Sequence, residues 1–168
     1  RDMYFGISGR YIRPMFNEAE KACKATKAID SAVLLFFQNA TKILFDSLQR
    51  VREVNRNLFN TEYKNKLAVG VIFCTVRRDT AIFICLLITP IETAEGLTFE
   101  PAITTSFEYD DTCATGMGHL TALNDSLPLP ETWKNKDPIK TAIRLIKKQS
   151  KETPDFVAPP VDVLILTK

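Results

Sequence analysis

The amino-acid sequence predicts a layered α+β fold, in which helices cover the faces of mostly antiparallel β-strands. Strands and helices come in blocks along the chain and do not alternate strictly. The helical patterns fall into two groups, residues 14–59 and 119–152, and each group needs one face of a sheet to cover. The chain has 168 residues, of which 45% are hydrophobic, enough for a single domain at residues 1–168 with a sizeable core. These observations predict a three-layer or four-layer sandwich.

The N-terminal third is predicted to be a short strand followed by two helices. Residues 3–8 form an apolar run that Gly9 closes, and Pro14 suits the first turn of a helix continuing through Cys23. Residues 28–59 give the strongest helical signal and would form a helix about 45 Å long. Its apolar residues recur at spacings of three and four, with a gap of seven near the end: Ile29, Val33, Phe36, Ala40, Leu44, Leu48, Val51 and Leu58. We expect a core helix that is covered on more than one side.

Two buried strands are predicted after a polar connector at residues 60–66. Residues 67–76 and 80–89 are rich in Val, Ile, Phe and Thr, and a hairpin through residues 77–79 is their natural connection. Because both runs are almost continuously apolar, we expect burial on both faces of the sheet.

The C-terminal part is predicted to contain one well-marked helix among shorter elements. Asp137 is a suitable cap for this helix and Pro138 a suitable first residue. The other predictions, in chain order, are a loop between Pro90 and Gly96, a strand at 102–109, a tight turn at Gly116, Met117 and Gly118, a short helix at 120–127 and a terminal strand at 161–166.

Composition excludes several classes of function. A net charge of +2 is too small to predict nucleic-acid binding, and an apolar run of eight residues at 81–88 is too short to span a membrane. The spacing of Cys23, Cys74, Cys85 and Cys113 fits no metal motif, so we expect reduced, buried thiols, no metal and no cofactor. We expect a cytoplasmic or nuclear protein, and a leader removed by processing is left open. Two sites fit the N-glycosylation pattern, Asn39 inside a predicted helix and Asn124.

Five short motifs stand in an order that matches a known family. They are FGISG at 5–9, LAVGV at 67–71, FEP at 99–101, ATGMGH at 114–119 and PVDVLILT at 160–167. In this order they resemble the proteasome-type N-terminal-nucleophile hydrolases. The resemblance spans nearly the whole chain and implies an αββα-type sandwich, with two helical groups covering mostly antiparallel sheets.

The resemblance also implies what is missing. In that family the nucleophilic Thr and its supporting Asp and Lys lie near the start of the mature subunit, whereas this chain starts with Arg1 directly before the first predicted strand. We therefore expect the first two strands of the family fold to be absent, and no Thr, Ser or Cys to serve as an N-terminal nucleophile. Met117 stands where the family has a helper serine, with Thr115 close by. The unpaired sheet edges would be filled by another chain, by tighter packing or by a separate fragment of the same precursor.

Few other residues are candidates for chemistry or binding. Cys113 and His119 could form a catalytic pair, with Thr115 between them, but a buried structural cysteine is commoner. A basic cluster at the end of the long helix is a candidate interaction surface: Arg50, Arg52, Arg56, Lys64 and Lys66. The alternative is that these residues are solvated and interact with the negative C-terminal end of the helix.

The resulting hypothesis is a non-catalytic, proteasome-like structural or interaction subunit. It would form a homo-oligomer or hetero-oligomer, and a companion chain could supply the missing strands. In the family the helix faces mediate ring stacking, which implies that residues 29–54 and the basic cluster are contact surfaces. Two alternatives remain: one fragment of a self-processed hydrolase whose nucleophile lies on a companion chain, and an unrelated module that binds a small molecule or a peptide.

Overall fold

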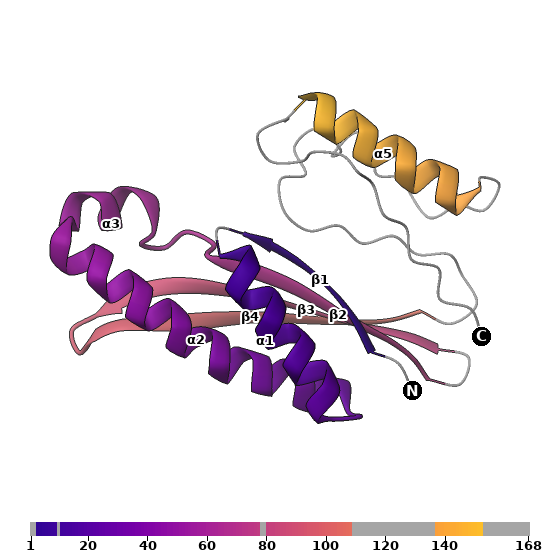
Figure 1. Ribbon diagram of the computed structural model, residues 1–168, viewed down its shortest axis with the longest axis horizontal. Coiled ribbons are helices and arrows are strands. Elements are labelled where there is room, and N and C mark those ends of the chain that lie inside the picture. The colour runs from indigo at the N-terminus through magenta and orange to yellow at the C-terminus, as the bar shows by residue number, and fades with distance from the viewer. Residues whose placement is uncertain (1–2, 10, 78–79, 109–136, 153–168) are drawn as a thin grey trace. The chain divides into compact units, whose positions relative to one another are not determined.

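The computed structural model describes residues 3–9, 11–77, 80–108 and 137–152 (Figure 1). The chain divides into two compact units, residues 1–77 with 81–107 and residues 78–80 with 108–168. Each unit is described by itself.

The first unit contains an antiparallel sheet of four strands in the order β1-β2-β3-β4 (Figure 1). The strands are β1 (Met3–Gly9), β2 (Val69–Arg77), β3 (Thr80–Thr93) and β4 (Gly96–Glu108). β1 pairs antiparallel with β2, with Phe5 opposite Phe73 and Gly9 opposite Val69. With helices layered on this sheet, the predicted α+β class is confirmed.

One face of the sheet carries the hydrophobic core, under α1 (Ile12–Ala25) and α2 (Ile29–Val54). Phe36 of α2 and Phe73 of β2 meet edge to face, with ring centroids 5.7 Å apart. Alternate residues of the strands point to the helices because the side-chain period of a strand is two. The buried core residues are Val69, Val71, Phe73, Ile84, Leu86 and Ile88 of the sheet, with Met15, Ala19, Ala22, Ile29, Ala32, Val33, Phe36, Ala40 and Leu44 of the helices. Pro14 lies in the first turn of α1, as predicted.

The opposite face of β2 and β3 is also apolar. Cys74 is buried there, and Ile72, Phe83 and Leu87 are half-buried. The three cysteines within the described residues, at positions 23, 74 and 85, are free thiols. Cys113 lies outside those residues.

The prediction of one helix over residues 28–59 is wrong, because the helix ends at Val54 and a second one, α3 (Arg56–Glu62), begins. Asn55 lies between them with φ −143° and ψ 82°, and its side-chain oxygen accepts a hydrogen bond from the backbone N–H of Leu58 at 2.9 Å. This is a standard helix N-cap. After this break, Phe59 packs with Leu48 and Leu97 in a second, smaller hydrophobic core. α3 also replaces the first part of the predicted polar connector.

The predicted loop between Pro90 and Gly96 is likewise wrong. β3 continues through Pro90 to Thr93, and β4 begins at Gly96 after a turn at residues 94–95. The carbonyl of Pro90 accepts a hydrogen bond from the N–H of Asn65 at 2.8 Å, and that of Ile88 accepts one from Ala68 at 3.0 Å. Pro90 has no N–H to donate, but its carbonyl still pairs with the segment that leads into β2.

Gly9 ends β1 in a conformation that other residues avoid. Its φ is +124°, and a Cβ atom added there would collide with the backbone carbonyl of Ala68. The glycine that closes the predicted first strand is therefore required by both backbone angle and space.

The second unit contributes one described helix, α5 (Pro138–Glu152). The side chain of Asp137 accepts a hydrogen bond from the N–H of Lys140 at 3.2 Å, which confirms the predicted cap. The predicted turn at 115–118, the helix at 120–127 and the terminal strand at 161–166 lie outside the described residues. A second sheet for the αββα arrangement depends on that strand.

The core contact of α2 gives a first testable prediction. Phe36 is fully buried, so Phe36→Ala should lower the free energy of unfolding by about 3–5 kcal/mol in a denaturant titration. Phe45 lies on the same helix but is 42% exposed, so Phe45→Ala should cost roughly 0.5 kcal/mol. Equal losses in the two variants would mean that α2 does not bury the face described above.

Candidate functional site

The two edges of the sheet differ in how they are protected against pairing with another strand. β4 carries Glu100 and Pro101, which are typical of an edge strand that avoids further pairing. β1 has the sequence MYFGISG, without a charge and without a proline. In the described part of the chain β1 has a strand neighbour on one side only. The β1 edge is therefore the one suited to accept another strand.

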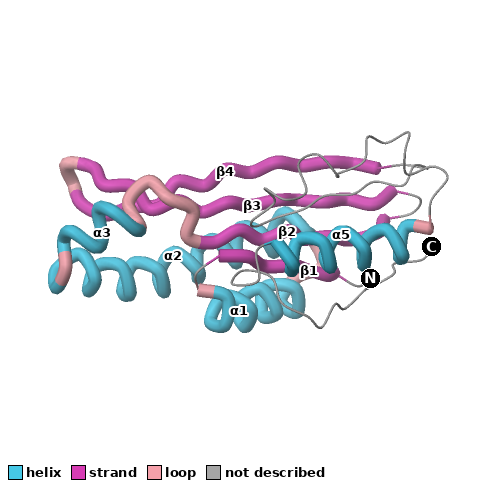
Figure 2. The backbone as a smooth tube through the Cα atoms, turned by 90° about the horizontal axis from the view of Figure 1, so that it is seen from above, coloured by secondary structure: helices cyan, strands magenta, loops and turns pink. Residues whose placement is uncertain are grey.

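Helix α1 extends beyond this edge. In Figure 2, α1 lies past β1 on the side away from β2. Glu18 marks the side of α1 that faces α2, because its carboxylate accepts a hydrogen bond from the side-chain amide of Asn39 at 3.2 Å. Phe16 and Cys23 lie about 140–160° around the helix from Glu18, at 100° per residue, and so on the side away from α2.

Phe16 and Cys23 give α1 an apolar underside next to β1. The Phe16 ring meets Phe5 of β1 edge to face, with centroids 5.0 Å apart, yet Phe16 remains 51% exposed. Half of a large aromatic ring is thus left uncovered at the place where a further strand would lie. We refer to residues 3–9 together with Phe16 and Cys23 as the β1 edge site.

Cys23 acts as an apolar surface in this site. Burial raises the pKa of its thiol to about 11, so the thiol is protonated at neutral pH. A protonated thiol behaves as a small hydrophobic group and is a poor nucleophile. Cys23 therefore contributes apolar surface to the β1 edge site.

Within the described part of the chain, the buried hydroxyl of Ser8, on the same strand, has no hydrogen-bond partner. A buried hydroxyl without a hydrogen-bond partner costs about 1–3 kcal/mol of stability. A bound chain that supplied a donor or an acceptor to Ser8 would therefore stabilise the folded protein.

Most residues of the predicted basic surface form ion pairs with carboxylates of the same chain. Three of its residues converge on one carboxylate, Glu92 at the end of β3, whose side chain is only 11% exposed. The shortest N–O distances are 2.9 Å from Arg52, 2.7 Å from Arg56 and 3.2 Å from Lys64. We call these four residues the Glu92 cluster.

The Glu92 cluster holds together segments that are distant in sequence. The hydrogen bond from Lys64 is the largest cause lowering the pKa of Glu92, and Arg56 and Arg52 add to it, so that the pKa falls from 4.5 to about 2. Arg52 lies in the last turn of α2 and Arg56 opens α3, so the cluster ties the bend between these helices to the end of β3. Of the other two predicted residues, Lys66 lies 4.0 Å from Glu62, and Arg50 is exposed.

A small cavity lies at the start of α2. It has a volume of about 340 Å³ and is lined by Lys27, Ala28, Ile29 and Asp30 of the helix start, and by Thr75, Arg77, Ile82, Ile84 and Thr105 of the sheet. Lys27, Asp30 and Arg77 are exposed, whereas Ile29 and Ile84 are buried. The cavity thus combines isoleucine side chains with two cations and one carboxylate.

The candidate catalytic residues Cys113, Thr115 and His119 lie outside the described part of the chain. The predicted turn residues Gly116, Met117 and Gly118 lie there too, as does Asn124. Asn39 lies in the middle of α2, with its side-chain amide bound to Glu18.

Among residues 3–9, 11–77, 80–108 and 137–152, no three His, Cys, Asp or Glu side chains gather as a metal site would require. None of the helices described there is long and apolar enough to cross a membrane.

Comparisons with protein-family models, with curated proteins and with solved structures found no match to this chain.

Sequence reasoning did not identify Phe16 as part of a site. The uncharged, proline-free run at residues 3–9 was a readable signal for an unprotected edge. The position of α1 beyond that edge follows from packing between distant helices, which the local pattern does not encode.

The Glu92 cluster predicts a specific dependence of stability on pH. Because the pKa is lower in the folded protein than the 4.5 of an unperturbed glutamate, ionised Glu92 stabilises the fold above about pH 4.5, and this contribution is lost as the pH falls to about 2. Glu92→Gln should therefore lower the thermal unfolding midpoint at pH 7, and its difference from the unmodified protein should disappear near pH 2. Glu95→Gln, on the exposed turn before β4, is the matched control and should change the midpoint little. A difference that stays constant from pH 7 to pH 2 would contradict the cluster.

Proposed function

We propose that this chain is a non-catalytic structural or interaction subunit that assembles with a companion chain by accepting one of its strands at the β1 edge. The observation that carries this proposal is the uncharged, proline-free β1 edge beneath the uncovered part of α1. An added strand would satisfy the outward N–H and C=O groups of β1 and bury Phe16. Main-chain hydrogen bonds would supply affinity, and the apolar underside of α1 would select side chains.

The chemistry of the site defines the strand that fits. Successive side chains of a strand point to opposite faces, so every second residue of the added strand would face α1. Those residues would meet Phe5, Phe16 and Cys23, which are aromatic or apolar. We therefore expect an extended segment with apolar residues at alternate positions and no charge on that face.

A second copy of this chain fits the site poorly. If two β1 strands paired about a two-fold axis perpendicular to the sheet, both α1 helices would lie on the same face and compete for the space beyond β1. If the axis ran along the strands, Tyr4, Gly6 and Ser8 of the second copy would face α1, since they alternate with the residues that pack on the core. Two hydroxyl-bearing side chains and a glycine match Phe16 less well than a row of apolar side chains does. A different chain that lacks a covering helix at that edge would fit the site better.

The resemblance to the proteasome-type N-terminal-nucleophile hydrolases supports assembly as the mode of action, because subunits of that family act in rings. The same resemblance leaves the alternative that the companion chain carries a nucleophile. Both versions use the β1 edge. They differ in whether the native material contains a second fragment, which intact-mass analysis detects, and in whether the assembled complex hydrolyses peptides.

The proposal is tested with a strand of known sequence as the probe. A seven-residue peptide of alternating Val and Thr should raise the unfolding midpoint of the full chain, because a ligand that binds only the folded state stabilises it. The same peptide with Pro at its central position should not, since it lacks a donor and cannot continue the pairing. Phe16→Glu should abolish the rise.

Leu34→Glu is the matched control for that experiment. Leu34 lies on α2 and is 57% exposed, close to the 51% of Phe16, so both changes place a charge on an exposed apolar site. Loss of the response in Leu34→Glu alone would assign the contact to the face of α2, as stacking through residues 29–54 would require. An equal response to both peptides would remove the β1 edge from consideration.

The cavity at the start of α2 supports a second candidate function, the binding of a small amphiphilic carboxylate. Its volume of about 340 Å³ is at the lower end of the range for ligand pockets. Two cations, Lys27 and Arg77, line it with three isoleucines and outnumber its one carboxylate, Asp30. We expect 4-methylpentanoate to raise the unfolding midpoint of the full chain and Arg77→Gln to weaken this effect about tenfold in ligand concentration. Arg50→Gln, on the exposed side of α2, should leave the response intact. Equal weakening in the two variants, or no rise at all, would exclude this candidate.

A further inference from the structure

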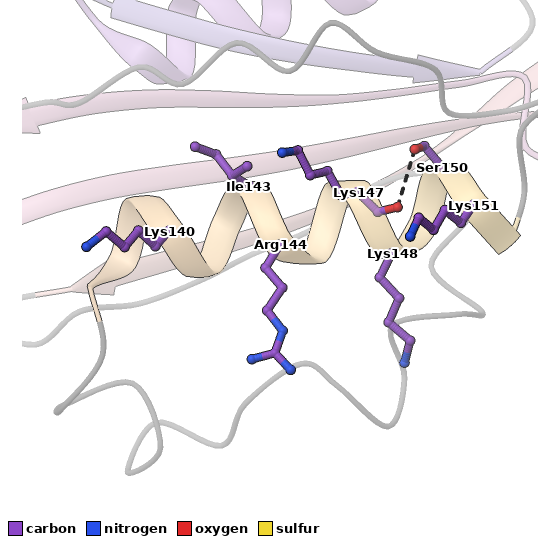
Figure 3. A pocket seen from close by; sticks show the side chains of 7 residues that line it. All are labelled: Lys140, Ile143, Arg144, Lys147, Lys148, Ser150 and Lys151. Carbon is purple, nitrogen blue, oxygen red and sulfur yellow. Dashed lines mark hydrogen bonds between the residues drawn. The ribbon is translucent and has the colours of Figure 1, made fainter.

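Helix α5 carries a line of positive charge along one side. Lys140, Arg144, Lys147 and Lys151 are spaced by four, three and four residues, which places them on one stripe of a helix. All four are exposed. Figure 3 shows their side chains extending from the same helix, with Lys148 beside them. We call these residues, with Lys148, the α5 stripe.

The α5 stripe concentrates charge that the rest of the chain does not share. The helix holds five of the 22 Lys and Arg residues but, at Glu152, only one of the 20 Asp and Glu residues, so the remainder of the chain has a small excess of acid. Within the described residues, the Nζ of Lys140 lies 3.5 Å from the carboxylate of Asp137, and both side chains are exposed. Such surface pairs contribute little.

This concentration is unfavourable for the helix by itself. Like charges three or four residues apart destabilise an isolated helix, and the stripe contains several such pairs, among them Lys140 with Arg144 and Lys147 with Lys151. An anion lying along the stripe would remove the repulsion and add attraction. The same side chains, with Ile143 and Ser150, line a hollow of about 680 Å³ (Figure 3).

We propose that the α5 stripe binds a short acidic segment of a partner protein. The four aligned residues span about 16 Å along the helix axis, at 1.5 Å per residue, a length that a few carboxylates on one side of a helix or strand can match. Ile143 is half-buried beside the stripe and offers an apolar contact to a residue between those carboxylates.

Extended polyanions fit the stripe less well than a short segment does. A nucleic-acid duplex or an anionic membrane presents charge over a wide area and would also face the mildly acidic remainder of the chain. Four of the five cations are Lys, whereas Arg is the residue suited to bidentate contacts with phosphate. The described part of α5 has no aromatic residue on which a base could stack.

The test uses the full chain and a fluorescent peptide of twelve residues rich in Glu, with a single Leu at its centre. Anisotropy titrations in about 50 mM salt should show saturable binding that weakens steeply as salt is raised. Lys147→Gln/Lys151→Gln should weaken binding about tenfold or more. The Gln side chain keeps a good helix propensity, so the helix itself is preserved.

Lys42→Gln/Arg50→Gln is the control with the same loss of charge, at two exposed positions of α2. It should bind the peptide within about twofold of the unmodified chain, because α5 is intact. Equal weakening in both double variants would show that only net charge matters and would overturn the proposal. Tighter binding of a DNA duplex, or of vesicles containing phosphatidylserine, than of the peptide would also overturn it. The Val-Thr peptide and the Phe16→Glu variant both test the β1 edge, which is a different surface. The outcome of the α5 experiment is therefore independent of theirs.

Discussion

The packing of α2 across the sheet is the constraint on which the rest of the first unit depends. Phe36 against Phe73 fixes α2 over β2, and the buried residues of β3 extend the same contact surface. With that position taken, α1 finds its contacts along the flank of α2 and above β1, where Glu18 reaches Asn39. The position of α1 beyond β1 is thus a consequence of where α2 lies. The packing of α2 on the sheet therefore determines that the apolar side of α1 lies next to the free edge of β1.

The Glu92 cluster explains why the most basic part of the sequence is not the most accessible one. Arg52, Arg56 and Lys64 come from a helix end, a helix start and a connector, and a single carboxylate gathers them. A cation that is already hydrogen-bonded to a carboxylate gains less from an external anion, because the existing contact must be shared or broken. On α5, by contrast, five Lys and Arg residues gather on one helix, and those at positions 140, 144, 147, 148 and 151 are all exposed. Accessibility of charge therefore depends on tertiary partners, which a count of Lys and Arg does not reveal.

Local patterns predicted the presence and type of most described elements, and they failed where tertiary contacts decided the outcome. Nearly continuous apolar runs located β1, β2 and β3, and Asp137 with Pro138 located α5. Asn55 was read as part of a helix because asparagine is only mildly unfavourable there; its role as a cap depends on the burial of Phe59. Pro90 was read as a breaker because its partner, Asn65, lies far away in sequence. The β1 edge site could be half predicted: its uncharged strand is visible in the sequence, but the position of Phe16 is not.

The two proposed contact surfaces differ in their physical basis, and this difference is a reason to treat them as separate functions. At the β1 edge, affinity would come from main-chain hydrogen bonds and from burying Phe16, both of which depend weakly on ionic strength. On α5, affinity would come from exposed Lys and Arg, whose attraction is screened within about 8 Å at physiological salt. A partner that used only the β1 edge would remain bound as salt rises, whereas one held by α5 alone would dissociate. A companion chain that engaged both would lose only part of its affinity, and the size of that loss would report how much α5 contributes.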